Sequence, residues 1–338
     1  MSHSATKTML VIRFSSMGDV AMTVPVLKNL LQQHPSLRVI MVSQQTFAPL
    51  FADIKGLDFF GADLKGRHRG MIGIWRLFKE LSAIKGVVSI ADLHNVLRTK
   101  LLTFLFKLSG QVVVAIDKGR KEKRVLTRKR NKQIKPLTTS FERYARVFTL
   151  LGFALTVEHT SISKKTNKKE RLQIGFAPFA KHRGKSLPLS MAKEFIGSLQ
   201  ESIPCHIYLF GAPGNEAITL AAWEKEFPNT INKAGTLALG QELQLIATMD
   251  LMITMDSANM HLASLVGTPV ISIWGATHPF AGFLGWGQST AQVIQADLPC
   301  RPCSVFGDKP CFRGDYACLQ QLSAQQMVQQ VRSYLCSK

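Results

Sequence analysis

Short apolar runs alternate with longer amphipathic stretches along the whole chain. Apolar runs rich in β-branched residues predict strands, and apolar positions recurring every three or four residues predict helices. In the first half the pattern predicts strands over residues 9–14, 38–43, 87–91 and 112–116, and helices over 19–33, 75–84, 96–108 and 140–151. Such alternation is typical of a parallel sheet covered by helices.

The same alternation begins again after a polar stretch, 161–171, that we interpret as a linker. Here the pattern predicts strands over 172–177 and 206–210, helices over 191–200, 216–227 and 241–248, and then a strand–helix–strand unit within 251–280. We therefore predict an α/β protein with two Rossmann-like, doubly wound domains facing across a cleft, over residues 1–165 and 166–322. A terminal helix is expected within 323–338.

Length and composition agree with two domains of this kind. The 338 residues suffice for two hydrophobic cores. No apolar run approaches the roughly 20 residues that span a bilayer, and the first seven residues show no signal-peptide pattern. We expect a cytoplasmic protein.

The net charge of +20 favours polyanionic partners such as nucleic acid, an anionic membrane face or phosphorylated substrates. Residues 118–135 hold ten basic residues against one acidic residue, Glu122, and a smaller basic run covers 164–171. Such a run is either a solvated loop or a segment that contacts membrane or phosphate. No aromatic residues alternate with the basic ones as in RNA-binding motifs, so we expect no nucleic-acid partner.

A first candidate site follows the first strand, where Ser15-Ser16-Met17-Gly18-Asp19 opens a helix. Small residues allow a ligand to approach the backbone, and the helix dipole favours an ionised Asp19. This carboxylate is either an ordinary cap of the helix or a general base for a sugar hydroxyl.

A second candidate site lies at the matching junction of the second half. Asp256 and Ser257 precede a helix whose first amides, from Ser257 to Asn259, can accept an anion such as a nucleotide diphosphate. Ordinary capping is the alternative. His261 lies one turn further on, where it either packs or faces the same junction.

Two loops after strands of the second half add charged candidates. Lys181, His182, Arg183 and Lys185 precede a helix that begins at a proline, and these cations can neutralise a departing diphosphate unless they form a solvated turn. Glu216 follows Gly211-Ala212-Pro213-Gly214 and can accept hydrogen bonds from ribose hydroxyls.

Four cysteines, Cys300, Cys303, Cys311 and Cys318, have a spacing that allows a structural zinc site. Packed, uncoordinated thiols are the alternative, and disulfides are not expected in a cytoplasm. We expect no catalytic metal.

Taken together, these motifs resemble those of the glycosyltransferase family nine heptosyltransferases. The segments that carry the resemblance are SSMGDV with Thr23-Val24-Pro25, Asp92-Leu93-His94-Asn95 with Arg98, the turn at Lys185, and MDSANMHLASLVGTPVISIWGATHP. They cover residues 9–319. The resemblance implies a GT-B fold, with an acceptor-binding first domain and a nucleotide-sugar-binding second domain.

The resemblance also implies a reaction and roles for residues. The enzyme would transfer heptose from ADP-heptose to the lipopolysaccharide inner core on its lipid A carrier, with inversion and without a metal, at the inner face of the inner membrane. The roles it implies are Asp19 as base; Lys181, Lys185, Glu216, Asp256, Ser257, Ala258 and His261 at the donor; and Ser16, Met17, Gly18, His94 and Arg98 at the phosphorylated, lipid-linked acceptor.

Three departures from the family pattern leave the donor open. Ala258 stands where Gly is usual, Ser186-Leu187-Pro188 replaces an aromatic residue before proline, and Phe179-Ala180 stands where hydroxyl residues are frequent. A different nucleotide sugar and a non-catalytic protein that binds a nucleotide or glycolipid are the alternatives. A dinucleotide-dependent oxidoreductase is disfavoured because the first helix lacks G-x-G-x-x-G.

Overall fold

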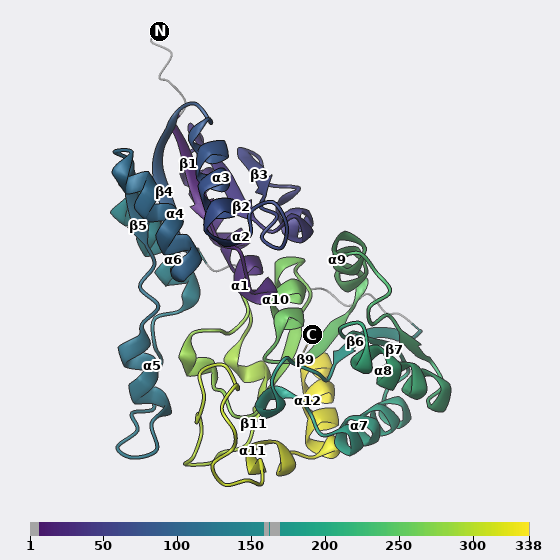
Figure 1. Cartoon of the computed structure of the whole chain (residues 1–338). Helices are drawn as coiled ribbons and strands as arrows, with labels where there is room; N and C mark the ends of the chain where they lie inside the picture. Colours follow the sequence, from purple (N-terminus) through teal and green to yellow (C-terminus); the bar gives the residue numbers. More distant parts are fainter. Residues whose placement is uncertain (1–6, 159–161, 163–169, 338) are drawn as a thin grey trace. The chain divides into compact units, whose positions relative to one another are not determined.

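The computed structural model describes residues 7–158, 162 and 170–337. The chain forms two compact α/β units (Figure 1). Unit 1 comprises Met1–Lys118 and Ser140–Glu158, and unit 2 comprises Gly119–Thr139 and His159–Lys338. The division differs from the predicted one because Gly119–Thr139, predicted within the first domain, packs with unit 2.

Unit 1 is built on a five-stranded sheet in the order β3-β2-β1-β4-β5, with every pair parallel. Its strands are β1 (Lys7–Ile12), β2 (Leu37–Ser43), β3 (Leu57–Gly61), β4 (Val87–Asp92) and β5 (Val112–Ala115). The central β1 is buried on both faces, which explains its continuous apolar run. The edge strand β3 was not predicted, since its LDFFG sequence is short and only half-buried.

The helices of unit 1 are α1 (Met17–Ala21), α2 (Thr23–Gln33), α3 (Gly70–Ser82), α4 (Leu97–Leu108) and α6 (Ser140–Leu150), with a 3-10 helix, η1, at Gln45–Phe51. The single helix predicted over 19–33 is divided at Met22. Pro25 explains the division, because its nitrogen has no hydrogen to donate to the carbonyl of Ala21. One core cluster packs the inner sides of α3 and α4 against the sheet.

Unit 2 is built on a six-stranded sheet in the order β11-β10-β9-β6-β7-β8, also parallel throughout. Its strands are β6 (Leu172–Ala177), β7 (Cys205–Leu209), β8 (Thr230–Asn232), β9 (Leu251–Met255), β10 (Val270–Trp274) and β11 (Val293–Gln295). The predicted strand–helix–strand unit is confirmed as β9, α10 (Ala258–Leu265) and β10. The short edge strands β8 and β11 were not predicted.

The remaining helices of unit 2 are α5 (Arg120–Thr127), α7 (Leu189–Ser202), α8 (Asn215–Glu226), α9 (Leu239–Thr248), α11 (Ala317–Gln320) and α12 (Ala324–Cys336), with 3-10 helices η2 (Arg183–Lys185), η3 (Pro279–Ala281) and η4 (Thr290–Gln292). Helix α12, predicted as a separate terminal element, contributes Met327, Val331 and Tyr334 to the same core as α7. It is therefore part of unit 2. The predicted linker lies largely outside the described residues.

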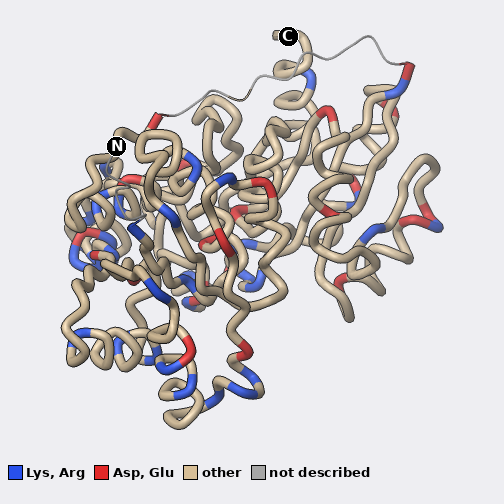
Figure 2. Tube along the Cα trace, turned by 90° about the horizontal axis from the view of Figure 1, so that it is seen from above, with Lys and Arg blue, Asp and Glu red and all other residues tan. Residues whose placement is uncertain are grey.

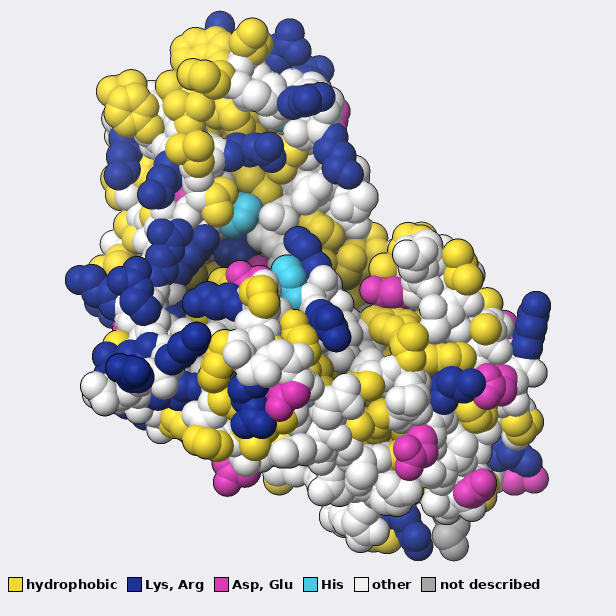
Figure 3. All heavy atoms as spheres, turned by 60° about the horizontal axis from the view of Figure 1, so that its bottom comes forward, with side chains coloured by type: hydrophobic (Ala, Val, Ile, Leu, Met, Phe, Trp, Pro, Cys, Tyr) yellow, Lys and Arg dark blue, Asp and Glu magenta, His cyan; other side chains and the backbone are white. Residues whose placement is uncertain are grey.

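The basic run 118–135 is not simply a loop, because its first part forms α5 and packs. Lys123 is buried with its Nζ 4.3 Å from the centre of the Phe283 ring, and Leu126 packs with Leu137. Lys132 donates through Nζ to the carbonyls of Cys300 and Pro302. Basic residues outnumber acidic ones along much of the trace (Figure 2), and many gather on one part of the face drawn in Figure 3.

Candidate active-site residues in the two units

In unit 1, Asp19 is the third residue of α1 and turns its carboxylate back toward the start of that helix. Ser16 caps the helix in an extended conformation, and its Oγ donates to Asp19 Oδ2 at 2.7 Å while its backbone nitrogen lies 3.3 Å from the same oxygen. This is the reciprocal arrangement of a capping box. The N-cap is therefore Ser16 and not Asp19, which contacts the cap from the third helical position. This arrangement places the Asp19 carboxylate at the carboxyl end of β1, and its role as a base stays a prediction.

Arg13, which the sequence analysis did not single out, forms an ion pair with Asp19. Its guanidinium lies 2.7 Å from Asp19 Oδ2 and also donates to the Leu93 carbonyl at 2.6 Å. The Arg13 side chain is 8% exposed and that of Asp19 is 26% exposed. A nearly buried cation thus holds a carboxylate that solvent can still reach.

Tyr144 of α6 completes this group from a distant part of the sequence. Its hydroxyl donates to the Asp19 carbonyl at 3.3 Å, and its ring is buried. Burial raises the pKa of Tyr144. Burial lowers the pKa of Arg13, but Tyr144 and Asp19 raise it by more, so the guanidinium stays charged.

His94 lies after β4, next to the same strand end. Its Nδ1 accepts from the Phe14 backbone nitrogen at 3.4 Å, and its own backbone nitrogen donates to Asp92 at 2.8 Å. Burial and the charge of Arg13 lower the pKa of His94 to about 3, with smaller contributions from Lys118 and Arg98. His94 is therefore neutral at physiological pH, with Nε2 as its donor. Arg98, in the first turn of α4, is exposed.

In unit 2, Lys185 and Asp256 form an ion pair between the loop after β6 and the end of β9. Lys185 Nζ lies 3.1 Å from Asp256 Oδ2, and the two side chains are 16% and 6% exposed. Because β6 and β9 are parallel neighbours, both residues lie at the carboxyl edge of the sheet, where open α/β folds bind ligands. The structure thus brings together two residues that the sequence separates by 71 positions.

Glycines at three positions, Gly184, Gly275 and Gly307, let the backbone pack closely around Lys185. A Cβ on Gly275 would lie 2.4 Å from the Gly184 carbonyl, and one on Gly307 would lie 2.4 Å from Lys185 Cγ. Ala276 donates its backbone hydrogen to the Gly184 carbonyl at 2.8 Å. These close approaches require glycine and leave the lysine few alternative conformations.

The other predicted donor residues have the following positions. Ser257 caps α10 with its Oγ 3.1 Å from Thr254 Oγ1, Ala258 begins α10, and His261 is buried one turn on. Glu216 Oε2 accepts from the Ala212 backbone nitrogen at 2.7 Å, so its carboxylate closes the loop after β7. Lys181 is exposed after β6. The ligand roles of these residues stay predictions.

The four clustered cysteines all have free thiols in unit 2. Burial raises the pKa of Cys318 to about 11 and also raises that of Cys303, with smaller contributions from neighbouring cysteines. Within residues 7–158, 162 and 170–337, no three His, Cys, Asp or Glu side chains are arranged as a metal-ligand set. The geometry therefore gives the predicted zinc site no support, and metal analysis of the purified protein is its test.

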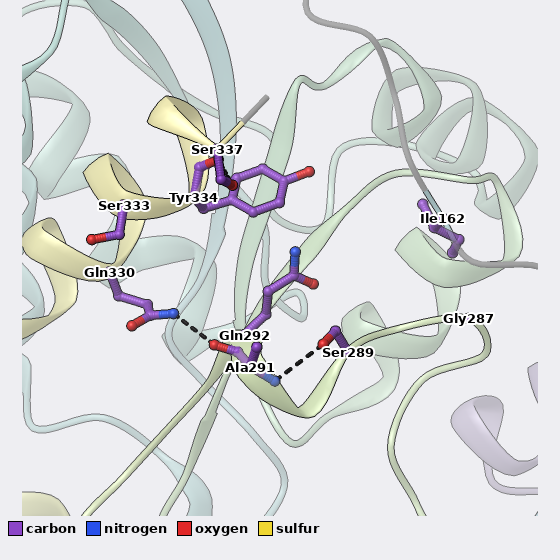
Figure 4. Close-up of a pocket in the computed structure, with 9 residues that line it drawn as sticks. All are labelled: Ile162, Gly287, Ser289, Ala291, Gln292, Gln330, Ser333, Tyr334 and Ser337. Carbon is purple, nitrogen blue, oxygen red and sulfur yellow. Dashed lines mark hydrogen bonds between the residues drawn. The ribbon is translucent and has the colours of Figure 1, made fainter.

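A pocket of about 360 Å³ lies elsewhere in unit 2, beside α12 and η4 (Figure 4). Gln330 donates to the Ala291 carbonyl across it, and the Ala291 nitrogen donates to Ser289 Oγ. It is lined by Ile162, Gly287, Ser289, Ala291, Gln292, Gln330, Ser333, Tyr334 and Ser337. None of these residues was predicted to bind donor or acceptor.

Known protein sequences are similar to this chain over different lengths. Residues 104–310 match the model of glycosyltransferase family 9 (heptosyltransferase). The lipopolysaccharide core heptosyltransferase OpsX of Haemophilus influenzae is 20% identical over 297 residues, 81% of each chain. The lipooligosaccharide heptosyltransferase 2 of Campylobacter jejuni is 31% identical over 107 residues, which are 32% of this chain and only 31% of that relative.

Solved structures show the same fold over nearly the full length. A family 9 glycosyltransferase from Veillonella parvula matches with a TM-score of 0.74 at 18% identity, covering 98% of each chain. The E. coli heptosyltransferase WaaC with ADP matches with a TM-score of 0.71 at 18% identity, covering 96% of this chain and 99% of that one. The two parallel α/β units therefore have the GT-B fold of these structures. The chain belongs to glycosyltransferase family 9, the heptosyltransferases.

Proposed function

We propose that the chain transfers a heptose from ADP-heptose to the inner core of lipopolysaccharide, with inversion at the anomeric carbon and without a catalytic metal. The observation that carries the proposal is the Lys185–Asp256 pair at the carboxyl edge of the unit 2 sheet. The names of the relatives support the sugar and the acceptor, since OpsX is a lipopolysaccharide core heptosyltransferase.

Asp256 acts on the donor through Lys185. A buried carboxylate repels a diphosphate, so direct contact between the two is unfavourable. Paired with Lys185, the carboxylate fixes the direction of the ammonium group. We therefore assign Lys185 to the departing ADP, where a fixed cation stabilises developing negative charge, and Asp256 to positioning that cation.

Asp19 acts on the acceptor. In the proposed step its carboxylate removes the proton from the attacking hydroxyl, whose oxygen forms the new bond to the anomeric carbon as the bond to ADP breaks on the opposite face. Arg13 keeps the carboxylate ionised before the reaction. Neutral His94 supplies a hydrogen-bond donor for the sugar.

Calorimetric titration with ADP, UDP, GDP and ADP-heptose tests the donor assignment. We expect wild-type protein to bind ADP and ADP-heptose, and Asp256→Ala to lose most of that affinity. Glu226→Ala is a matched control, because Glu226 forms an exposed pair with Lys193 at 2.7 Å. Binding of UDP or GDP alone would keep the glycosyltransferase assignment and exclude ADP-heptose as the donor.

A further inference from the structure

The outer side of unit 1 exposes an unusual number of large apolar side chains on two adjacent helices. On α3 the exposed residues are Met71, Ile72 and Trp75, and on α4 they are Leu97, Phe104 and Leu108. We call these six residues the α3–α4 face. Met71, Ile72 and Leu97 are each more than 70% exposed. A contiguous patch of this kind on a folded protein marks an interaction surface.

The face lies opposite the apolar sides by which the two helices already contact the core. Ile74 and Leu77 of α3 and Leu102 and Phe106 of α4 pack in the core of unit 1. The rings of Phe78 and Phe106 are 5.0 Å apart and join the two helices. Both helices are therefore apolar on two sides, whereas a helix that faces water on one side is usually polar there.

The charges that border the face are positive. Arg76 and Lys79 on α3 and Lys100 and Lys107 on α4 are exposed. Helix α4 contains no acidic residue, and the one in α3, Glu80, is paired with Arg67 at 2.6 Å. Figure 3 shows hydrophobic side chains bordered by Lys and Arg on the part of unit 1 drawn uppermost.

This combination fits a lipid surface better than a protein partner. Protein interfaces are depleted of lysine, whereas anionic bilayers attract it and accept apolar side chains below the headgroups. Lys79 Nζ lies 5.5 Å from the centre of the Trp75 ring, so the lysine stem covers an aromatic ring of the type that settles at membrane interfaces.

The lengths of the two helices limit how they can meet a bilayer. Helix α3 has 13 residues and α4 has 12, which corresponds to about 20 Å each, against a hydrocarbon core of about 30 Å. Among the described residues no helix has the length and apolarity to span a membrane. Helices of this kind lie in the plane of the interface.

We propose that the α3–α4 face docks unit 1 onto an anionic phospholipid bilayer, with Trp75, Phe104 and Leu108 among the headgroups. The proposal deepens the proposed function, on which it rests for its reason, because a lipid-linked acceptor is presented at such a surface. The apolar residues would provide most of the affinity and the lysines the preference for anionic lipid.

Co-sedimentation with vesicles tests the proposal. We expect wild-type protein to bind vesicles of phosphatidylglycerol and phosphatidylethanolamine, to bind phosphatidylcholine vesicles poorly, and to lose affinity with added salt. Phe104→Ser/Leu108→Ser should bind at least about tenfold more weakly, since each side chain loses its apolar burial in lipid. Ile218→Ser is the matched control, because Ile218 is 70% exposed in unit 2. Thermal melts check that all variants fold.

A second pair of substitutions separates lipid docking from its alternatives. Lys100→Glu/Lys107→Glu should abolish the preference for anionic vesicles. Three results would overturn the proposal: wild-type protein that ignores anionic vesicles, binding that survives both double substitutions, or a wild-type dimer that Phe104→Ser/Leu108→Ser dissociates. ADP titration of the same variants tests the proposed function separately, since donor binding should be unchanged in all of them.

Discussion

The two units carry an aspartate at equivalent places, but they bury it to different extents. Asp19 follows β1 and lies inside α1, whereas Asp256 follows β9 and lies just before the cap of α10. Each is paired with a cation, Asp19 with Arg13 at 2.7 Å and Asp256 with Lys185 at 3.1 Å. In the first pair Asp19 is the more exposed member, with 26% of its side chain accessible against 8% for Arg13.

In the second pair the order is reversed. Asp256 is 6% exposed and Lys185 is 16% exposed. A group that exchanges a proton with a substrate must be reached by it, and a group that only orients its partner need not be. The comparison teaches that the more accessible member of the pair is the carboxylate in unit 1 and the cation in unit 2, as the proposed roles of a base and a phosphate-binding cation require.

The largest expected effect is on Asp19. Asp19→Asn keeps the shape but cannot accept the proton, so we expect kcat to fall about 1,000-fold while the Kd for ADP is unchanged. Asp58→Asn is the control, since Asp58 forms an exposed pair with Arg38. Equal losses of turnover and ADP affinity would contradict a role for Asp19 as base and break the comparison.

Lys185 comes next. Lys185→Ala should weaken ADP binding by about 30-fold, because it removes the cation and leaves a buried carboxylate near the phosphates. Lys185→Ala/Asp256→Asn should recover part of that affinity if Asp256 acts only through Lys185. Calorimetry measures both, with Lys193→Ala as the control. A double variant no better than the single one would mean that Asp256 contacts the donor itself.

Arg13 should have a smaller effect, confined to turnover. Arg13→Gln removes the cation that favours ionised Asp19, so we expect kcat to fall about tenfold and the acid limb of the pH–rate profile to move to higher pH. Arg38→Gln, which opens the exposed pair with Asp58, should leave the profile in place. An unmoved acid limb in Arg13→Gln would show that Arg13 is structural only.

The smallest expected effect concerns stability. Because the pKa of His94 is about 3 in the folded chain and near 6.5 when unfolded, the unfolded chain binds more protons between these values. The contribution of neutral His94 is present above pH 6.5 and is lost as the pH falls toward 3. Urea unfolding at pH 7 and pH 4.5 should therefore show a smaller acid-induced loss in His94→Gln than in wild type. Equal losses would contradict the neutral assignment.

Much of the fold could be predicted because buried parallel strands are locally distinctive. The central strands β1, β4 and β6 were each predicted within two residues, and β9 was predicted as the first strand of the unit within 251–280, since strands covered on both faces form continuous apolar runs. The edge strands β3, β8 and β11 were missed because they are short and partly solvated. The packing of the basic segment at α5 was not predicted because Lys123 contacts Phe283 and Leu126 clusters with Ala281, both more than 150 positions away.

The candidate site was predictable only in part for a related reason. Asp19, Asp256 and Lys185 stand beside glycine or at helix starts, where local sequence signals a ligand-facing junction. Arg13 sits within an apolar strand sequence and Tyr144 within an ordinary amphipathic helix, so neither has a local signal. Their importance comes from contacts with Asp19 that span 6 and 125 positions.

The sequence by itself determined the α/β class, the central strands and the aspartates that follow β1 and β9, because hydrophobic periodicity and helix-start chemistry act over neighbouring residues. Only the tertiary structure decided which cation each aspartate contacts and which member of each pair is accessible to solvent. It also decided that α3 and α4 each expose a second apolar side that does not pack in the core. Burial and ion pairing depend on residues brought together from distant parts of the chain, and no local pattern encodes them.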